Sequence, residues 1–526
     1  MNRKLLVVGL FFAVAIAAAG IWLGAPKLKA LLMSREDSKP PTVYVTYLDT
    51  SMYDVERTSY VHWIEPSEVH GGGLARLGTG LILATGDGRL FFFREKAAKD
   101  GLELRPLHYS APLDAAQFDH DARRIIGGPV ELQWFRVADV LIQSRGENLR
   151  LFVSHHYWNT HQSCFGVRVS VLEGRADDLL GPGGVLRWRT IYETTPCLKL
   201  NTEGPRGSRF AGLEMGGRMA LLGDETLLLT VGDLEFDGWN RTPALGQDVA
   251  SPYGKTMLLH LDTGSAEVYS LGHRNPQGLE VDARGTVWST EHGPRGGDEL
   301  NIIRQGANYG WSKVTYGTDY GMHRWPLSST QGRHDGFEKP LFAWVPSGGI
   351  SELIAVRGPL FELWRGDLLV SFLGGRLDRV RVEDGRVIFA EPIKIGRRIR
   401  SLVEAADGRI VLWTDQSEMI FLAPSTRTSG EILSFQCAGC HAFKEWEHSS
   451  IGPRLWGVVG RKPASLEDFS FSPAMRELSG TWTRERLDAF LANPRGVVPG
   501  TTMQFPGIAN AAERARLIDY LETLKF

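Results

Sequence analysis

The chain has 526 residues, of which 43% are hydrophobic and 23% are charged, and its formal net charge is -2. This composition is that of a globular protein, and the length allows two or three domains. A charge so close to neutrality gives no basic surface for phosphate groups, so we expect no nucleic-acid partner. The 60 glycines favour a turn-rich β architecture.

The N-terminal segment is basic and then apolar. Arg3 and Lys4 precede an uncharged run over residues 5–26, which is long enough to cross a bilayer as a helix. We interpret residues 1–42 as a single-pass membrane anchor, an N-terminal transmembrane helix followed by a polar stalk. The alternative is a cleaved signal peptide, since the run is rich in alanine.

A turn followed by a short apolar run of β character recurs about six times in the middle of the chain. The runs cover residues 80–85, 149–154, 226–233, 285–290, 366–371 and 408–415. Each repeat is long enough for several short strands, and radial repetition protects sheet edges. We therefore predict an all-β, six-bladed β-propeller over residues 43–423, with two stacked β-sandwiches as the alternative.

Three histidines, His155, His156 and His161, crowd one of these strands and its exit loop. A metal site would need further ligands at suitable spacing, and no carboxylate or cysteine pair accompanies them. We interpret them as surface or rim histidines.

Polar and glycine residues are dense between residues 272 and 311. On chemistry alone, Arg274, Asn275 and Gln277 offer hydrogen-bond donors for an anionic or carbonyl-rich ligand. Asp298, Glu299 and exposed loop carbonyls offer hard oxygen ligands for calcium. Isolated stretches of this kind are ordinary turns, but several close together favour a binding site.

This stretch resembles the PQQ-dependent soluble aldose and glucose dehydrogenases, which are six-bladed propellers with a calcium-supported quinone. The similarity is close over residues 272–317, fair over 212–415 and poor before that. It implies that the quinone is contacted by these residues: Arg274, Asn275, Gln277, Arg398 and Arg400.

The same resemblance implies two calcium sites. The carbonyls of Gly293 and Pro294 would bind the calcium of the cofactor, and Glu299 with Tyr309 would belong to a second, structural calcium site.

Two positions depart from the family pattern. A histidine two residues before Gly-Gly-Arg is the family's general base, and Glu214 holds its place here. A carboxylate accepts a proton from a sugar hydroxyl near neutral pH if desolvation raises its pKa, so Glu214 is the predicted catalytic base. The family's cofactor-contacting lysine is expected near residues 373–375, where none stands, so one positive charge over the quinone is missing.

The C-terminal part carries the c-type haem attachment pattern. Cys437 and Cys440 are placed to bind the haem covalently, and His441 follows at once as an axial ligand of the iron. Met503 lies in a turn-rich loop over residues 499–503 and is the predicted sixth ligand, although a lone methionine can also fill a core. A Met/His pair suits electron transfer.

Residues 431–526, which follow a polar linker over residues 424–430, resemble a class I cytochrome c of the mitochondrial and alphaproteobacterial type. We therefore expect a small all-α domain. Besides the haem motif, the similarity rests on residues 452–457, 460–462, 481–483, 493–494 and the methionine loop.

This second resemblance implies that Arg461 and Trp482 lie at the haem propionates and that Pro453 supports His441. Phe471 and Phe490 stand where many family members have tyrosine, so a hydroxyl group near the haem is lost at each position.

The two remaining cysteines, Cys164 and Cys197, are a candidate disulfide, because haem is attached outside the cytoplasm. Two buried free thiols are the alternative.

Together these patterns predict a periplasmic quinohaemoprotein anchored in a bacterial inner membrane. A sugar or alcohol would be oxidised at PQQ, and the electrons would pass to haem c and then to a respiratory acceptor. The alternative is a non-catalytic, degenerate propeller that serves as a docking or binding module for an electron-transfer cytochrome. Glu214 and Gly374 favour this alternative, whereas the retained donor residues favour the enzyme.

Overall fold

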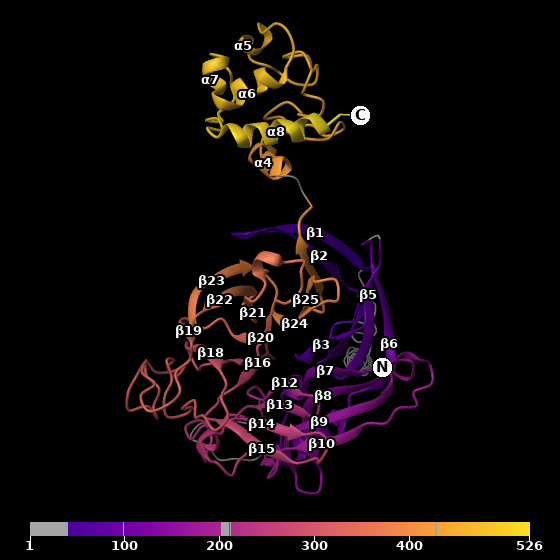
Figure 1. Ribbon diagram of the computed structural model, residues 1–526, viewed down its shortest axis with the longest axis vertical. Helices are drawn as coiled ribbons and strands as arrows, with labels where there is room; N and C mark the ends of the chain where they lie inside the picture. Colours follow the sequence, from indigo (N-terminus) through magenta and orange to yellow (C-terminus); the bar gives the residue numbers. More distant parts are fainter. Residues whose placement is uncertain (1–39, 98, 201–209, 211, 427–428, 526) are drawn as a thin grey trace, which may run out of the picture. The chain divides into compact units, whose positions relative to one another are not determined.

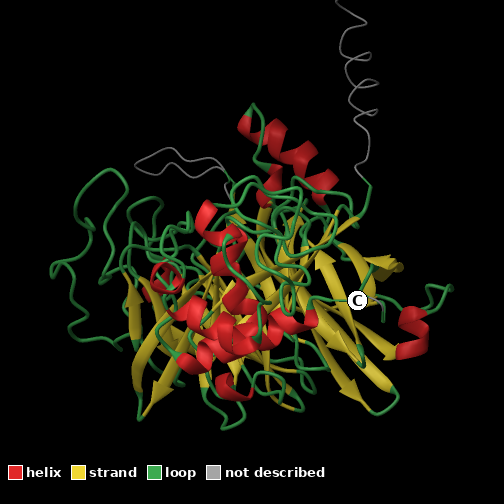
Figure 2. Cartoon of the chain, turned by 90° about the horizontal axis from the view of Figure 1, so that it is seen from above, coloured by secondary structure: helices red, strands yellow, loops and turns green. Residues whose placement is uncertain are grey.

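The computed structural model describes residues 40–97, 99–200, 210, 212–426 and 429–525. It divides after Pro424 into two compact units. The first is built mainly of strands and loops, and the second of helices and loops (Figure 1, Figure 2). The expected membrane-spanning run over residues 5–26 lies outside the described residues, and within the described ranges no helix is long and apolar enough to cross a bilayer.

The first unit is a ring of six antiparallel sheets, the blades of a propeller (Figure 1). Two blades are β3 (Gly72–Leu77), β4 (Gly80–Thr85), β5 (Arg89–Glu95), β6 (Leu102–Ser110) and β7 (Val137–Arg145), β8 (Asn148–Asn159), β9 (Cys164–Arg175), β10 (Arg189–Glu193), with β11 (Leu198–Lys199) paired to β9. Two more are β12 (Gly216–Gly223), β13 (Thr226–Val231), β14 (Lys255–His260), β15 (Ala266–Leu271) and β16 (Pro276–Val281), β17 (Val287–Glu291), β18 (Asp298–Ile302), β19 (Phe342–Trp344). The fifth is β20 (Ile350–Ala355), β21 (Leu368–Phe372), β22 (Arg376–Glu383), β23 (Arg386–Lys394).

The sixth blade closes the ring with strands from both ends of the unit. It consists of β1 (Thr42–Asp49), β2 (Asp54–Val61), β26 (Met419–Pro424), β25 (Ile410–Thr414) and β24 (Ile399–Glu404). Val55 pairs with Pro424, and Tyr60 pairs with Met419. This pairing ties the two ends of the propeller together and protects the sheet edges.

The six apolar runs predicted from the sequence fall on the second strand of each blade: β4, β8, β13, β17, β21 and β25. Nearly every residue of these strands is buried. A strand covered on both faces reads as a continuous apolar run, which is why this signal was the strongest in the sequence. The six-bladed propeller is confirmed.

The first strands of the blades, β3, β7, β12, β16, β20 and β24, each contact the next around the ring. Arg218 on β12 is only 2% exposed and joins four other blades at the axis. It donates to the carbonyls of Gln277 (2.8 Å), Ser351 (2.9 Å) and Arg400 (2.8 Å), and pairs with Asp139 (3.1 Å) and Glu352 (2.6 Å). A buried charge with this many partners fixes the inner strands relative to one another.

Two of the clustered histidines lie in the core. His155 and His156 on β8 are fully buried, so the expectation that they lie at the surface or rim is wrong. His155 Nε2 lies 3.0 Å from the hydroxyl of Ser170, and His156 Nδ1 accepts a hydrogen bond from the backbone N–H of Arg136 at 3.2 Å. Burial lowers the pKa of His155 to about 4, so its imidazole is neutral at physiological pH.

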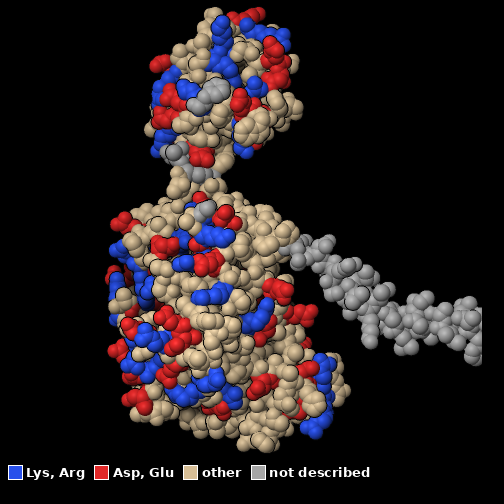
Figure 3. Space-filling view, turned by 90° about the vertical axis from the view of Figure 1, so that its right-hand side faces the viewer, with Lys and Arg blue, Asp and Glu red and all other residues tan. Residues whose placement is uncertain are grey.

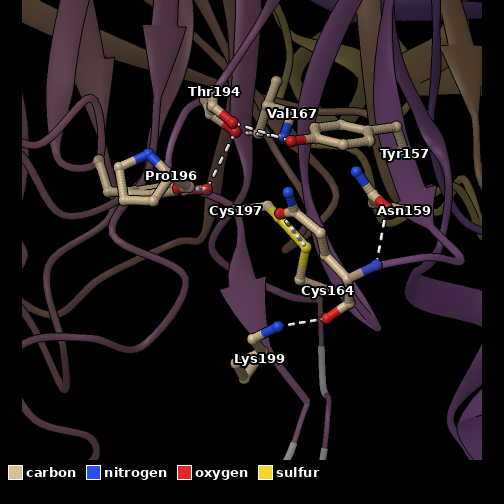
Figure 4. The surroundings of a disulfide bond; sticks show 10 residues. Tyr157, Asn159, Cys164, Val167, Thr194, Pro196, Cys197 and Lys199 are labelled. Carbon is tan, nitrogen blue, oxygen red and sulfur yellow. Dashed lines mark hydrogen bonds between the residues drawn. A yellow bond between two sulfur atoms is a disulfide. The ribbon is translucent and has the colours of Figure 1, made fainter.

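Cys164 and Cys197 form a disulfide, which confirms the candidate pairing (Figure 4). Their Cα atoms are 5.6 Å apart and their sequence separation is 33 residues, for which loop closure predicts roughly 3–4 kcal/mol of stabilisation. Thr194 ties the same segment to the blade, since its carbonyl accepts from the hydroxyl of Tyr157 at 2.8 Å and its hydroxyl accepts from the N–H of Val167 at 3.0 Å.

A helix that the sequence analysis missed, α2 (Ala115–Ile126), packs on β8. It buries Phe118 and Ala122, one helical turn apart, and its Asp121 accepts from the indole of Trp158 at 2.9 Å. The described part of the unit has four other short helices: η1 (Leu132–Trp134), α3 (Ala176–Leu180), η2 (Leu245–Gln247) and η3 (Glu362–Trp364).

The second unit consists of α4 (Ser429–Ala438), α5 (Pro473–Arg476), α6 (Arg484–Ala492), α7 (Pro494–Val497) and α8 (Ala511–Thr523). Helix α8 contacts both α4 and α6. Side chains cap the N-termini of α6 and α8. The hydroxyl of Thr483 accepts a hydrogen bond from the N–H of Arg486 (3.3 Å), and the side-chain oxygen of Asn510 accepts one from the N–H of Ala512 (2.9 Å). On the face that Figure 3 shows, basic and acidic side chains are interspersed over each unit.

Candidate active site and haem crevice

A cavity of about 480 Å³ lies in the second unit. It is lined by the residues that the sequence assigns to the haem: Cys437, Cys440, His441, Arg461, Trp482 and Met503. Phe471 and Phe490 line it too, so the tyrosine hydroxyls of many relatives are absent from this wall.

His441 is oriented for iron ligation. Its Nδ1 lies 2.7 Å from the carbonyl oxygen of Pro453, and because a carbonyl only accepts, the ring donates from Nδ1. The predicted support of His441 by Pro453 is thereby confirmed. Burial lowers the pKa of His441, so the ring is neutral and the lone pair of Nε2 is left for a metal.

Arg461 fits a carboxylate-bearing group in the same cavity. Its guanidinium donates to the carbonyls of Trp456 at 2.9 Å and Arg454 at 2.7 Å. Burial lowers its pKa to about 10, and no carboxylate of the described residues lies within ion-pair distance. A partly buried guanidinium without an acidic partner among the described residues suits the propionate of a haem.

A second cavity, of about 540 Å³, lies at the axis of the propeller and is called the axial cavity below. It is lined by all six residues that the sequence predicts for base and quinone: Glu214, Arg274, Asn275, Gln277, Arg398 and Arg400. These residues stand at the beginnings of the inner strands β12, β16 and β24, which the ring brings to one end of the axis.

Glu214 forms an ion pair with Arg274, and both side chains are about nine-tenths buried. Arg274 also donates to the carbonyl of Gly293 at 3.1 Å and lies over the ring of Trp311, 5.4 Å from its centroid. The ion pair therefore fixes Glu214 in the wall of the cavity.

A second carboxyl group shares a hydrogen bond with Glu214. Asp233 is fully buried, and burial, followed by the charge of Glu214, raises its pKa well above the usual value. Glu214 Oε2 is buried and has no other donor among the described residues. Asp233 in turn accepts from the indole of Trp311 at 2.6 Å. The raised pKa of Asp233 favours the protonated form of this carboxyl group beside Glu214.

Asn275 and Gln277 link two blades at the cavity. The amide of Gln277 donates to the side-chain oxygen of Asn275 at 2.9 Å and to the carbonyl of Gly216 at 3.1 Å, and the N–H of Gly216 donates to Asn275 at 3.1 Å. These bonds hold the start of β12 against the start of β16.

Arg398 and Arg400 share one acid. Asp415 accepts from Arg400 at 2.8 and 2.9 Å and from Arg398 at 3.2 Å. Burial acts to raise the pKa of Asp415, but Arg400 together with His70 and Arg398 holds the pKa below the usual value. Because two arginines share one carboxylate, the group of three side chains keeps a net positive charge beside the cavity.

The predicted calcium carbonyls already carry protein hydrogen bonds. The carbonyl of Gly293 accepts from Arg274, and that of Pro294 accepts from the hydroxyl of Tyr320 at 3.2 Å. Each carbonyl oxygen keeps a second lone pair. Among the described residues, no cluster of three or more His, Cys, Asp or Glu side chains is arranged to hold a metal ion.

At the second predicted calcium site, Glu299 contacts His334 Nε2 at 3.2 Å and the amide of Asn301 at 3.2 Å. The hydroxyl of Tyr309 donates to the carbonyl of Ile302 at 2.6 Å, so a calcium contact from Tyr309 would come from its main chain. A cavity of about 10 Å³, the size of one water molecule, lies among Glu299, Tyr309 and His334.

Other residues that line the axial cavity were not singled out as site residues from the sequence: Trp134, Arg136, Leu213, Glu235, Asn240, His292, Tyr320 and Leu373. His292 lies in the glycine-rich stretch that was recognised, but Trp134 and Arg136 precede an ordinary apolar strand. The only signal there was an arginine directly before a buried run.

A propeller with a donor-rich axial cavity, joined to a helical unit with a CxxCH crevice, defines a redox protein of two domains. The family model described as glucose/sorbosone dehydrogenase matches residues 203–422. The aldose sugar dehydrogenase YliI of Escherichia coli is 31% identical over 277 residues, which are 48% of this chain and 68% of that protein. The chain therefore belongs to the glucose/sorbosone dehydrogenase family, with a cytochrome c domain at its C-terminal end.

Other relatives match one part each. An uncharacterized protein of Synechocystis is 34% identical over 255 residues, which are 44% of this chain and 58% of that protein. A cytochrome c of Trypanosoma brucei brucei is 47% identical over 77 residues, 15% of this chain and 83% of that protein. The crystal structure of the soluble aldose sugar dehydrogenase from Escherichia coli in the apo-form matches with a TM-score of 0.54 at 25% identity, over 73% of this chain and all of that one.

Proposed function

We propose that the protein is a periplasmic quinohaemoprotein, anchored in the bacterial inner membrane, that oxidises a sugar or alcohol and passes the electrons to haem c. One observation carries this proposal: the axial cavity joins a carboxylate base, Glu214, to a set of donors for a polyanionic quinone. The same chain supplies a crevice for an electron-accepting haem.

The axial cavity fits PQQ, a tricarboxylate quinone. Four arginines line it, and the Nε atoms of Arg136 and Arg274 are buried without a hydrogen-bond partner among the described residues. Unpartnered buried donors are costly, and carboxylate or carbonyl oxygens of a ligand would satisfy them. Arg274, Asn275, Gln277, Arg398 and Arg400 would therefore hold PQQ.

Glu214 would accept the proton of the substrate hydroxyl. Arg274 orients the carboxylate of Glu214 through their ion pair, and Asp233 hydrogen-bonds to the same carboxylate. PQQ, when bound, supplies the acceptor for the hydride of the substrate carbon, and haem c supplies the one-electron steps that follow. The chain itself contributes the base, the orientation of the substrate and the positive field.

Calcium is part of the proposal at two places. The second lone pairs of the Gly293 and Pro294 carbonyls would serve the calcium of the cofactor. Glu299, with the main chain of Tyr309, would serve a structural ion, and the buried side-chain oxygen of Asn301, which has no donor among the described residues, supports an oxygen-rich site there.

The rival function is a non-catalytic propeller that serves as a docking or binding module for the cytochrome. Two features favour it, since Glu214 replaces the family's histidine and no lysine stands at residues 373–375. The two functions differ in one property, the binding of PQQ.

The test uses the purified full chain with its covalent haem. We expect PQQ to bind in a calcium-dependent way, measured by equilibrium dialysis, and an aldose or alcohol then to reduce the haem, seen as growth of the ferrous absorption bands. Samples with a calcium chelator, and samples without PQQ, should show no reduction by the substrate. Absence of PQQ binding in excess calcium would reject the enzyme and leave the docking module.

The membrane anchor gives a separate expected result. Residues 5–26 carry no charge and exceed the usual apolar core of a cleaved signal. The protein should stay in the membrane fraction after washing at high salt and should keep its N-terminus by sequencing. A soluble form that begins near residues 20–30 would identify the run as a cleaved signal instead.

A further inference from the structure

The axial cavity contains one arginine that lacks an acidic partner. Arg274 is paired with Glu214, and Arg398 and Arg400 are both paired with Asp415. Arg136, the fourth arginine of the lining, has no carboxylate within ion-pair distance among the described residues. It was not part of the family motif and comes from a different blade.

The guanidinium of Arg136 is almost completely buried, with 3% of the residue exposed. Among the described residues it makes two long hydrogen bonds to neutral carbonyls, those of His70 at 3.3 Å and Leu213 at 3.4 Å, and its Nε has no partner. Burial, followed by the charge of Arg400, lowers its pKa to about 9. A buried cation in this state gains most from an anion brought by a ligand.

The position of Arg136 is built by its surroundings. The core histidine His156 holds its backbone twice, since Nδ1 accepts the N–H of Arg136 at 3.2 Å and the N–H of His156 donates to the carbonyl of Arg136 at 3.0 Å. The guanidinium lies over the ring of Trp134, 5.5 Å from its centroid. A Cβ atom at Gly71 would lie 3.0 Å from Cδ of Arg136 and 2.4 Å from a backbone oxygen. Glycine at this position therefore avoids a steric clash with the side chain of Arg136.

We propose that Arg136 binds a carboxylate group of the ligand that fills the axial cavity. This inference rests on the proposed function. Arg136, which directly precedes β7, would supply a positive charge to a cavity in which the family's lysine at residues 373–375 is missing. The carboxylate belongs to PQQ or to an acidic sugar substrate, and the two sources are separated by experiment.

The test compares variants of the full haem-bearing chain. Arg136→Gln is expected to weaken PQQ binding about 10- to 100-fold, because a charge-assisted hydrogen bond in a buried site is lost. Arg136→Lys, which keeps the charge, should recover most of the affinity. Arg168→Gln is the matched control, since Arg168 also lies over an aromatic ring, that of Tyr157 at 4.8 Å, but stands outside the cavity, and it should bind PQQ like wild type. Dissociation constants come from equilibrium dialysis in excess calcium.

The remaining outcomes decide the source and the fate of the inference. If PQQ binding is unchanged in Arg136→Gln but the KM of a uronic acid rises relative to that of the neutral aldose, the carboxylate is the substrate's. If neither changes in a variant that melts like wild type, the inference is wrong. Should Arg136→Gln fail to fold, Arg136→Met keeps the apolar stem and carries the test. A wild-type chain without PQQ binding rejects the proposed function, and if it binds no uronic acid either, the inference falls too.

Discussion

Glu214→Gln is expected to slow the reduction of haem by substrate about 10²- to 10⁴-fold at saturating PQQ, because an amide cannot accept the hydroxyl proton. Glutamine keeps the size of the side chain, so the cavity keeps its shape. The measurement is the growth of the ferrous haem bands after rapid mixing of the PQQ-loaded protein with an aldose.

The ion pair with Arg274 makes one control necessary, since the substitution also frees that guanidinium. The dissociation constant of PQQ is therefore measured separately and should stay within a few-fold of wild type. Reduction of the haem by ascorbate, which does not use the axial cavity, should be unchanged. A Glu214→Gln protein that binds PQQ and oxidises the aldose at the wild-type rate would show that another group is the base.

The architecture was predictable because its strongest signal is local. In each blade the second strand is covered on both faces, so β4, β17 and β25 are continuous apolar runs that a sequence displays directly. Helix α2 gave no such signal, since it buries only one narrow face through Phe118 and Ala122. The positions of the two buried histidines of β8 were predicted wrongly for a different reason. A histidine that is hydrogen-bonded inside the core cannot be distinguished in the sequence from one at the surface.

In the candidate site too, the residues that could be predicted are those that stand together in a local sequence motif. Arg274, Asn275 and Gln277 stand in one short motif, and the structure places all three on the axial cavity. Arg136 belongs to no motif, and what distinguishes it from the other arginines of the cavity is that no described residue gives it an acidic partner. Ion pairing of this kind depends on which blades face one another, and it cannot be predicted from the spacing of residues along the chain.

The replacement of histidine by glutamate changes the electrostatics of the cavity as well as the base. Glu214 neutralises the charge of Arg274, whereas a neutral imidazole at this place would leave the arginine unpaired. The extra negative charge weakens the attraction for an anionic quinone. Arg136, which has no acidic partner among the described residues, increases that attraction. The glutamate at residue 214 and the arginine directly before β7 are therefore best considered together.

Met503→Ala is expected to keep the covalent haem but to remove the ferric Met-to-iron charge-transfer band and to lower the reduction potential. The haem stays because the two cysteine sulfurs hold it, while the loss of a thioether ligand removes the stabilisation of ferrous iron. Met503 lies in an irregular loop, and its backbone N–H donates a hydrogen bond to the hydroxyl of Thr501 at 3.3 Å. The crevice offers a matched control in Met475, a second methionine of the lining that stands on the short helix α5. Met475→Ala should keep both the band and the potential, and if it loses them while Met503→Ala retains them, Met475 is the ligand.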